Sequence, residues 1–168
     1  GRGREPISGR LVADLWKAAG ADRIMSVDLH AAQIQGFFDG PVDHLFAKPV
    51  LLEYFERTLS AEDRADLTVV SPDTGRVRVA DTWSDSLGAP LAIIHKRRDP
   101  NVANQITVNE IVGHVDGRVC LLVDDMIDTG GTIVKAAQAL KKSGAKKVIV
   151  AATHAIFSDP AAERLQDV

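Results

Sequence analysis

The sequence is poor in cysteine and lacks any long apolar run. Its single cysteine, Cys120, excludes an internal disulfide bond and fits the reducing cytosol, so we expect a cytoplasmic protein. No stretch has the length and apolar character of a membrane-spanning helix, and no signal peptide is visible. The 20 Lys and Arg residues against 23 Asp and Glu residues leave a formal charge of −3, which gives no reason to expect a nucleic-acid or membrane partner.

Two common nucleotide-binding motifs are also missing from residues 119–132, where acids and glycines gather. A P-loop would place a lysine after its glycines, and the dinucleotide fingerprint needs three spaced glycines. Instead, the apolar run 119–123 predicts a strand buried on both faces, and the spacing of apolar residues after Thr132 predicts a helix. A strand, a glycine-containing loop and a helix start together form a geometry that binds an anion.

Three carboxylates stand beside this predicted anion site. Asp124 and Asp125 would repel a bare phosphate, so we expect them to accept hydrogen bonds from sugar hydroxyls or to approach Mg²⁺. Phosphate and vicinal hydroxyls occur together in a ribose 5-phosphate group. The plainer alternative is that Asp124, Asp125 and Asp128 only end the strand and cap the helix. Three acids within five residues, ahead of Thr-Gly-Gly-Thr, favour ligand binding over that alternative.

The segment 124–132, DDMIDTGGT, resembles the phosphoribosyl-pyrophosphate (PRPP) loop shared by type I phosphoribosyltransferases and PRPP synthetases. Residues 3–8 and 27–38 resemble a signature of PRPP synthetases that phosphoribosyltransferases lack. The resemblance to PRPP synthetases implies a Mg²⁺-dependent transfer of pyrophosphate from ATP to the anomeric hydroxyl of ribose 5-phosphate, which yields PRPP and AMP. It also implies a homo-oligomer, a hexamer in the family, with ATP sites shared between subunits.

The same resemblance implies roles for individual residues. The ribose hydroxyls would be held by Asp124 and Asp125. The 5-phosphate would be bound by Asp128, Thr129, Gly130, Gly131 and Thr132. His30 and Asp73 would serve Mg²⁺. Lys96 and Arg98, in an expected flexible loop, would be the catalytic residues that stabilise the transition state.

The loop after Asp73 departs from the family pattern. Thr74 and Gly75 would embrace the pyrophosphate side of the site, although Pro-Asp-x-Gly is also common in ordinary turns. Arg76 stands where the family usually has a second glycine. Such a residue either narrows the loop or adds a phosphate contact, and the sequence leaves both open.

Alternating strand and helix patterns predict an α/β fold, with a mostly parallel twisted sheet and helices on both faces, of the type I phosphoribosyltransferase kind. We expect residues 1–46 to form the tail of an N-terminal domain of this kind, and residues 47–168 an incomplete C-terminal one. Within the first part, a helix after Pro6 should bury a stripe of apolar residues, and 41–46 should be a connection. Within the second part, 60–66 should be a polar linker. The apolar positions of the first stripe are Ile7, Leu11, Val12, Leu15 and Ala19.

The resemblance starts past the family's first ATP-binding segments and stops before its last strands. We therefore expect a fragment that keeps the ribose-phosphate half of the site and turns over negligibly alone. Two other functions stay open. One is a phosphoribosyltransferase, which would need a base-binding hood that the sequence does not show. The other is a catalytically silent PRPP synthetase-like subunit, against which the joint presence of His30, Asp73, Lys96 and Arg98 argues.

Overall fold

A computed structural model describes residues 8–98 and 107–166 of the chain. The chain divides into two compact units, unit 1 over Gly1–Ala47 and unit 2 over Lys48–Val168, and each is described by itself. Within the described ranges, no helix is both long and apolar enough to cross a membrane. The interpretation of unit 1 as the tail of a preceding domain stays a prediction.

Unit 1 is a small α/β unit built around two parallel strands. Its elements are α1 (Ser8–Ala18), β1 (Ile24–Val27), the 3-10 helix η1 (Ala32–Phe37) and β2 (Val42–Leu45). The expectation that 41–46 is only a connection is wrong, because β2 pairs with β1 from Ile24 opposite Val42 onward. A strand of four residues whose partner lies 18 positions earlier leaves no periodic signal in its own sequence.

Helix α1 forms where its spacing predicts, but its apolar stripe is not buried. Only Ala13 is buried among its residues, while Leu11 and Leu15 are each 59% exposed. The predicted buried stripe is therefore wrong within unit 1 for Leu11, Val12, Leu15 and Ala19, and its first member, Ile7, lies outside the described residues. Periodicity identifies the helix and its apolar face, whereas burial depends on a neighbouring element, and the described part of unit 1 leaves Leu11 and Leu15 uncovered.

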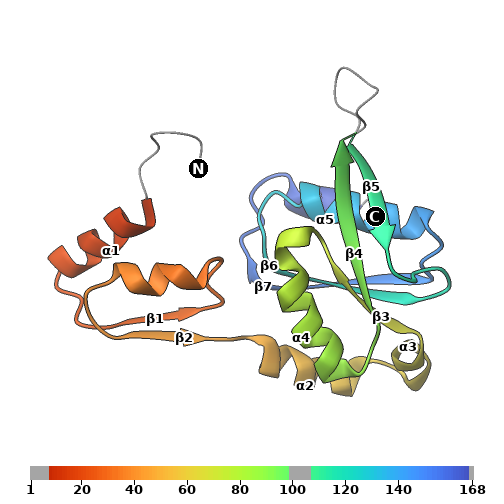
Figure 1. The fold of residues 1–168 in the computed structure, drawn as a ribbon, viewed down its shortest axis with the longest axis horizontal. Helices are drawn as coiled ribbons and strands as arrows, with labels where there is room; N and C mark the ends of the chain where they lie inside the picture. Colours follow the sequence, from red (N-terminus) through yellow and green to blue (C-terminus); the bar gives the residue numbers. More distant parts are fainter. Residues whose placement is uncertain (1–7, 99–106, 167–168) are drawn as a thin grey trace. The chain divides into compact units, whose positions relative to one another are not determined.

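Unit 2 holds a five-stranded sheet with the order β5-β4-β3-β6-β7, in which only β5 is antiparallel (Figure 1). Its elements in chain order are α2 (Lys48–Thr58), α3 (Ala61–Ala65), β3 (Leu67–Ser71), η2 (Thr74–Arg76), α4 (Val77–Leu87), β4 (Leu91–Arg98), β5 (Thr107–Val112), β6 (Val119–Ile127), α5 (Gly131–Lys142), β7 (Lys147–Ala155) and α6 (Ala161–Gln166). The expected linker 60–66 contains α3, which Ser60 caps by accepting a hydrogen bond from the Asp63 N–H. The predicted α/β class, with a mostly parallel sheet, is confirmed.

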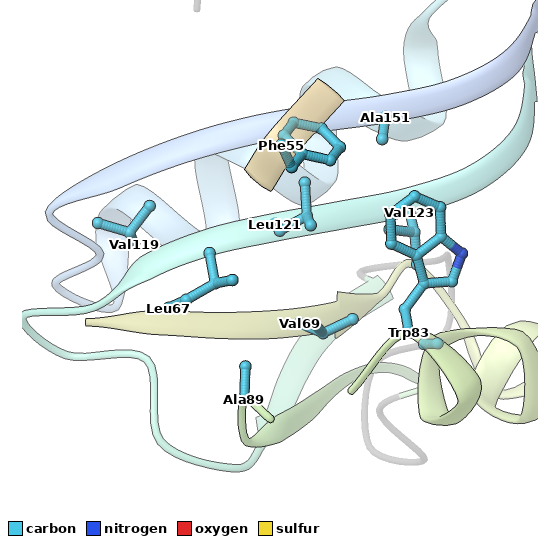
Figure 2. Close-up of a cluster of buried hydrophobic side chains, with 10 residues drawn as sticks. Phe55, Leu67, Val69, Trp83, Ala89, Val119, Leu121, Val123 and Ala151 are labelled. Carbon is cyan, nitrogen blue, oxygen red and sulfur yellow. The ribbon is translucent and has the colours of Figure 1, made fainter. Parts of the chain in front are cut away.

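The two faces of the sheet carry separate apolar cores, as expected for strands buried on both sides. On one face, Phe55 of α2 and Trp83 of α4 pack with Leu121 and alternate residues of β3 and β6 (Figure 2). On the other face, Leu122 packs with Leu140 and further residues of α5. Because neighbouring residues of β6 enter opposite cores, this strand is the centre of the domain, and helices cover both faces of the sheet.

The arrangement of β3 and β6 fixes where polar residues collect. The chain leaves β3 for β4 on one side and leaves β6 for β7 on the other, although β3 and β6 are neighbours. The loops that follow β3 and β6 therefore diverge from one point on the side of the sheet where the parallel strands end, which we call the carboxyl edge; the opposite side, where they begin, is the amino edge. Such a switch point is where open α/β sheets bind ligands. Unit 2 thus has one position that its topology favours for a site.

Candidate functional site

The loop after β3 is organised by Asp73. Its Oδ1 accepts hydrogen bonds from the N–H groups of Gly75 and Arg76, at 2.8 and 3.0 Å. The Ser71 hydroxyl donates to the Asp73 carbonyl at 2.7 Å. These bonds hold the turn η2, with Thr74 and Gly75 exposed on it. No described residue donates a hydrogen bond to Oδ2 of Asp73.

Asp124 and Asp125 lie inside β6 rather than after it. The strand runs to Ile127 because β7 is equally long and pairs with it beyond the end of β3. The Asp125 N–H donates to Oδ1 of Asp124 at 2.8 Å. Burial raises the pKa of Asp124 to about 6; the neighbouring Asp125 side chain adds to the rise and Arg76 opposes it. Two adjacent carboxylates thus share a poorly hydrated place at the switch point.

Arg76 joins the loop after β3 to the carboxyl-terminal part of β6 through its side chain. Its Nε lies 3.5 Å from Oδ1 of Asp124, and its Nη2 pairs with Oδ2 of Asp125. The side chains of Arg76, Asp124 and Asp125 are only 14%, 16% and 8% exposed. The sequence singled out Arg76 but assigned it no partner. The structure pairs it with the two carboxylates expected to bind the sugar.

The glycine loop between β6 and α5 has the backbone form of an anion site. Gly130 precedes α5 in the left-handed conformation, with φ of 74°, and no side chain caps the helix. The first-turn N–H groups therefore have no partner inside the helix. Asp128, Thr129 and Thr132 are exposed around them. The alternative that Asp128 serves as the helix cap is wrong, because Gly130 holds the cap position.

Sequence reasoning missed Arg164 of α6, which contacts this glycine loop. Its Nη1 donates to the carbonyl of Thr129 at 3.0 Å. A methyl group placed on Gly131 would lie 3.6 Å from the same nitrogen. The guanidinium thus fixes the loop from outside and adds positive charge beside it. No local pattern could have found this contact, because it joins residues 35 positions apart.

Lys96 and Arg98 lie in β4, so the expectation that they belong to a loop is wrong for their backbone. From Ile94 to Arg98, β4 pairs with β5 alone and continues past its pairing with β3 as a two-stranded ribbon (Figure 1). Because β4 is parallel to β3, this ribbon extends from the carboxyl edge that carries the other candidate residues. The side chains of Lys96 and Arg98, and residues 99–106 of the expected flexible loop, lie outside the described part.

His30 is exposed and follows β1 in unit 1. The segment around it is tied to β2, because the Leu29 N–H donates to Nε2 of His44 and the Ala47 N–H donates to Oδ2 of Asp28. Asp73 belongs to unit 2, so the expected joint Mg²⁺ site of His30 and Asp73 stays a prediction.

The described residues contain no group of three or more His, Cys, Asp or Glu side chains arranged to hold a metal. Mg²⁺ does not require such a group, since it is usually bound by one or two carboxylates together with waters and substrate phosphates. Asp73 fits this manner of binding. One of its oxygens orders the loop, and the other accepts no hydrogen bond from the described residues.

The chain is similar over nearly its whole length to PRPP-forming enzymes. It is 69% identical over 166 residues to the protein named ribose-phosphate pyrophosphokinase of Streptomyces coelicolor, covering 99% of this chain and 50% of that protein. It is 60% identical to phosphoribosylpyrophosphate synthetase from Mycobacterium smegmatis; the crystal structure gives a TM-score of 0.86 and covers 98% of this chain and 51% of that one. The chain thus spans about half the length of these relatives, and the resemblance to PRPP synthetases is confirmed.

The fold extends to more distant proteins. Purine phosphoribosyltransferase from Pyrococcus horikoshii aligns with a TM-score of 0.52 at 22% identity, covering 83% of this chain and 82% of that one, which shows the fold alone. The family described as phosphoribosyl transferase domain matches residues 51–167. This match includes β3, β6 with Asp124, α5 and the loops that carry Asp73 and Gly130, so the predicted type I phosphoribosyltransferase-like fold is confirmed. The chain belongs to the phosphoribosyl transferase domain family.

Proposed function

We propose that this chain forms the ribose-phosphate-binding part of a ribose-phosphate pyrophosphokinase. The enzyme transfers pyrophosphate from ATP to the anomeric hydroxyl of ribose 5-phosphate, giving PRPP and AMP. The observation that carries the proposal is the meeting of the Asp73 loop, the Asp124–Asp125 pair and the glycine loop at one switch point. The identity of 69% to a protein of that name supports the choice of reaction.

The glycine loop suits the 5-phosphate. The uncapped first turn of α5 offers backbone donors and the positive end of the helix dipole. The hydroxyls of Thr129 and Thr132 and the guanidinium of Arg164 add donors around the same place. A phosphate bound there would place the ribose ring toward the end of β6.

Asp124 and Asp125 would then accept hydrogen bonds from ribose hydroxyls and orient the sugar. Their ionised form is the one that accepts such bonds. The anomeric oxygen attacks the β-phosphorus of ATP and loses its proton to water, a new P–O bond forms, and the bond from the β-phosphorus to the α-phosphate oxygen breaks with AMP leaving. No covalent intermediate with the protein is needed, so its task is alignment and charge neutralisation.

Asp73 would hold Mg²⁺ by its Oδ2, with His30 as a second candidate ligand. When bound, the ion neutralises charge on the transferred pyrophosphate. Lys96 and Arg98 would stabilise the transition state from the β4–β5 ribbon, which starts at the same edge of the sheet. Thr74 and Gly75 would line the pyrophosphate side through the exposed turn η2.

The direct test is release of AMP from ATP with ribose 5-phosphate and Mg²⁺, measured on the natural protein that contains this chain. Ribose and inorganic phosphate, added separately, are the matched controls. AMP release only with ribose 5-phosphate is the expected result. Consumption of PRPP with a free base would instead indicate a phosphoribosyltransferase. Sugar-phosphate binding without either reaction would indicate a silent subunit.

Binding to the 168-residue chain tests the assignment of the half-site. We expect ribose 5-phosphate and PRPP to bind more tightly than ATP in calorimetric titrations, because the described anion loops suit the sugar phosphate. Equal or tighter ATP binding would contradict this. The homo-oligomer, a hexamer in the family that the sequence resembles, is part of the proposal and is checked by light scattering. Cytoplasmic location is also proposed and is checked by cell fractionation.

A further inference from the structure

Arg76 is held both by its backbone and by its guanidinium. Its backbone N–H donates a hydrogen bond to Oδ1 of Asp73, which fixes the backbone of Arg76 in the loop that would face the pyrophosphate. Its guanidinium pairs with Asp124 and Asp125, the carboxylates that would face the sugar. One residue therefore connects the loop after β3 with the carboxyl-terminal part of β6, the two sides of the proposed site.

The position of the guanidinium is one that a divalent cation would otherwise favour. Two adjacent carboxylates with little exposure repel each other and attract a cation, and carboxylate oxygen is the preferred ligand of Mg²⁺. Arg76 contacts oxygens of both carboxylates and supplies one positive charge. A divalent cation at the same carboxylates would find oxygens already bound by Arg76, and it would be repelled by the charge of the guanidinium.

We propose that Arg76 is a positioning residue that takes the place of a divalent cation at the Asp124–Asp125 pair. It keeps both carboxylates ionised and fixed for the sugar hydroxyls, and it confines Mg²⁺ to the Asp73 side. This inference rests on the proposed function for the identity of the sugar, but the cation exclusion does not depend on it. It adds a third role to the two that the sequence left open, a narrower loop and a phosphate contact, because the side chain pairs with carboxylates.

The first experiment measures Mn²⁺ binding by electron paramagnetic resonance, without any sugar. The variants are Arg76→Ala, Arg76→Met, which keeps the aliphatic bulk, and Arg76→Lys, which keeps the charge. We expect the Ala and Met variants to gain a Mn²⁺ site, or to bind Mn²⁺ about tenfold more tightly, because the carboxylates lose their counter-ion. The Lys variant should bind Mn²⁺ as the unchanged chain does. Adding Asp125→Asn to Arg76→Ala should abolish the gain.

Equal Mn²⁺ binding by the unchanged chain and by a folded Ala or Met variant would overturn the inference. Loss of pyrophosphate binding in these variants without a new Mn²⁺ site would also overturn it, since it would make Arg76 a phosphate contact. Circular dichroism identifies which of the two uncharged variants is folded, and either one decides the result.

The second experiment measures ribose 5-phosphate affinity with and without Mg²⁺. The unchanged chain should show less than about a twofold effect of Mg²⁺, because its carboxylates already have a fixed cation. Arg76→Ala should bind about tenfold more weakly without Mg²⁺ and recover when Mg²⁺ is added. The same Mg²⁺ dependence in both proteins would overturn the inference. If the unchanged chain binds no ribose 5-phosphate, the proposed function fails, while the Mn²⁺ result still decides the role of Arg76.

Discussion

One arginine lies beyond each end of the neighbouring strands β3 and β6, Arg118 before β6 and Arg76 after β3, and the two residues have different partners. At the amino edge, Arg118 donates from Nη2 to the Leu67 carbonyl at 2.6 Å and from Nε to the Thr68 hydroxyl at 3.0 Å. At the carboxyl edge, Arg76 pairs with the carboxylates of Asp124 and Asp125. The acceptors are neutral at one edge and charged at the other.

The difference follows from the topology of the sheet. At the amino edge, Arg118 donates hydrogen bonds to the Leu67 carbonyl and to the hydroxyl of the fully buried Thr68, and these bonds satisfy polar atoms inside the fold. At the carboxyl edge the connections diverge, and two adjacent carboxylates with little exposure lie there. Such an arrangement costs stability unless a counter-ion or ligand is present. The amino edge therefore supports the fold, and the carboxyl edge is where we place the chemistry.

The largest contrast between the edges is expected in turnover. Lys96→Ala should lower kcat by ~10² or more with little change in KM, because it removes positive charge needed mainly in the transition state. The matched control is Lys146→Ala at the amino edge, where the lysine pairs with Glu62 and Asp66. Steady-state kinetics on the natural protein that contains this chain provides the comparison. A pure KM effect of Lys96→Ala would contradict transition-state stabilisation and indicate uniform substrate binding.

Removing the amino-edge arginine should reduce stability instead. Arg118→Ala should lower the free energy of unfolding by about 2–3 kcal/mol, since two hydrogen bonds from a charged donor are lost and a buried carbonyl is left without its partner. Urea unfolding measures this change. Ribose 5-phosphate affinity of the folded variant should stay within about twofold of the unchanged chain, because the contact lies at the opposite edge. A large loss of ribose 5-phosphate affinity in Arg118→Ala, with an unchanged free energy of unfolding, would contradict the assignment of the amino edge to stability and of the carboxyl edge to binding.

Much of the fold was predictable because its signals are local. The apolar run that begins β6, the spacing of α5 and the glycine after α4 identify their elements without any partner. The failures concern partners. Strand β2 is recognisable only beside β1, and the exposure of Leu11 and Leu15 depends on what packs against α1. Hydrophobic periodicity gives the face of a helix, and it does not say whether that face is covered.

The candidate site divides in the same way. Asp73 and the glycine loop follow buried strands, and Asp124 follows the apolar run within β6, so their place at the carboxyl edge could be predicted from sequence order. The contacts of Arg76 and Arg164 could not, because they join residues 48 or 49 and 35 positions apart. The sequence predicts a loop at Lys96 because the apolar part of the strand ends at Ile94. The ladder with β5 extends β4 beyond that part, to Arg98. Long-range pairing, rather than composition, decided these cases.

Variants of the glycine loop should differ from an amino-edge variant in substrate binding rather than in turnover. Asp128→Ala and Thr132→Ala should each weaken ribose 5-phosphate binding by about 1–3 kcal/mol, the usual effect of losing a hydrogen bond to or from a charged group. Asp116→Ala, in the exposed turn before β6 at the amino edge, is the matched control and should bind normally. Calorimetric titration compares the three. Unchanged ribose 5-phosphate affinity in both loop variants would contradict the assignment of the 5-phosphate to the glycine loop.

The smallest expected effect is a pH dependence of stability that belongs to the carboxyl edge. The pKa of Asp124 is about 6 in the folded chain, against 3.8 for an unperturbed group. Because the folded state binds this proton more strongly, its stabilising contribution is complete below about pH 4 and is lost as the pH rises through about 6. A shift of this size corresponds to at most ~3 kcal/mol, and water at the partly exposed carboxylate should reduce it to about 1–2 kcal/mol.

Asp124→Asn removes this contribution, while the acids that do not interact with Asp124 titrate equally in both proteins. The difference in unfolding free energy between the Asn variant and the unchanged chain should shift in favour of the variant from pH 4.5 to pH 7, by about 1–2 kcal/mol. Arg118→Ala should show no comparable shift, because its lost acceptors are uncharged at every pH in that range. Urea unfolding at several pH values tests both. A difference that stays constant with pH for Asp124→Asn would mean that its carboxyl titrates normally, and that burial at the carboxyl edge does not distinguish it from the amino edge.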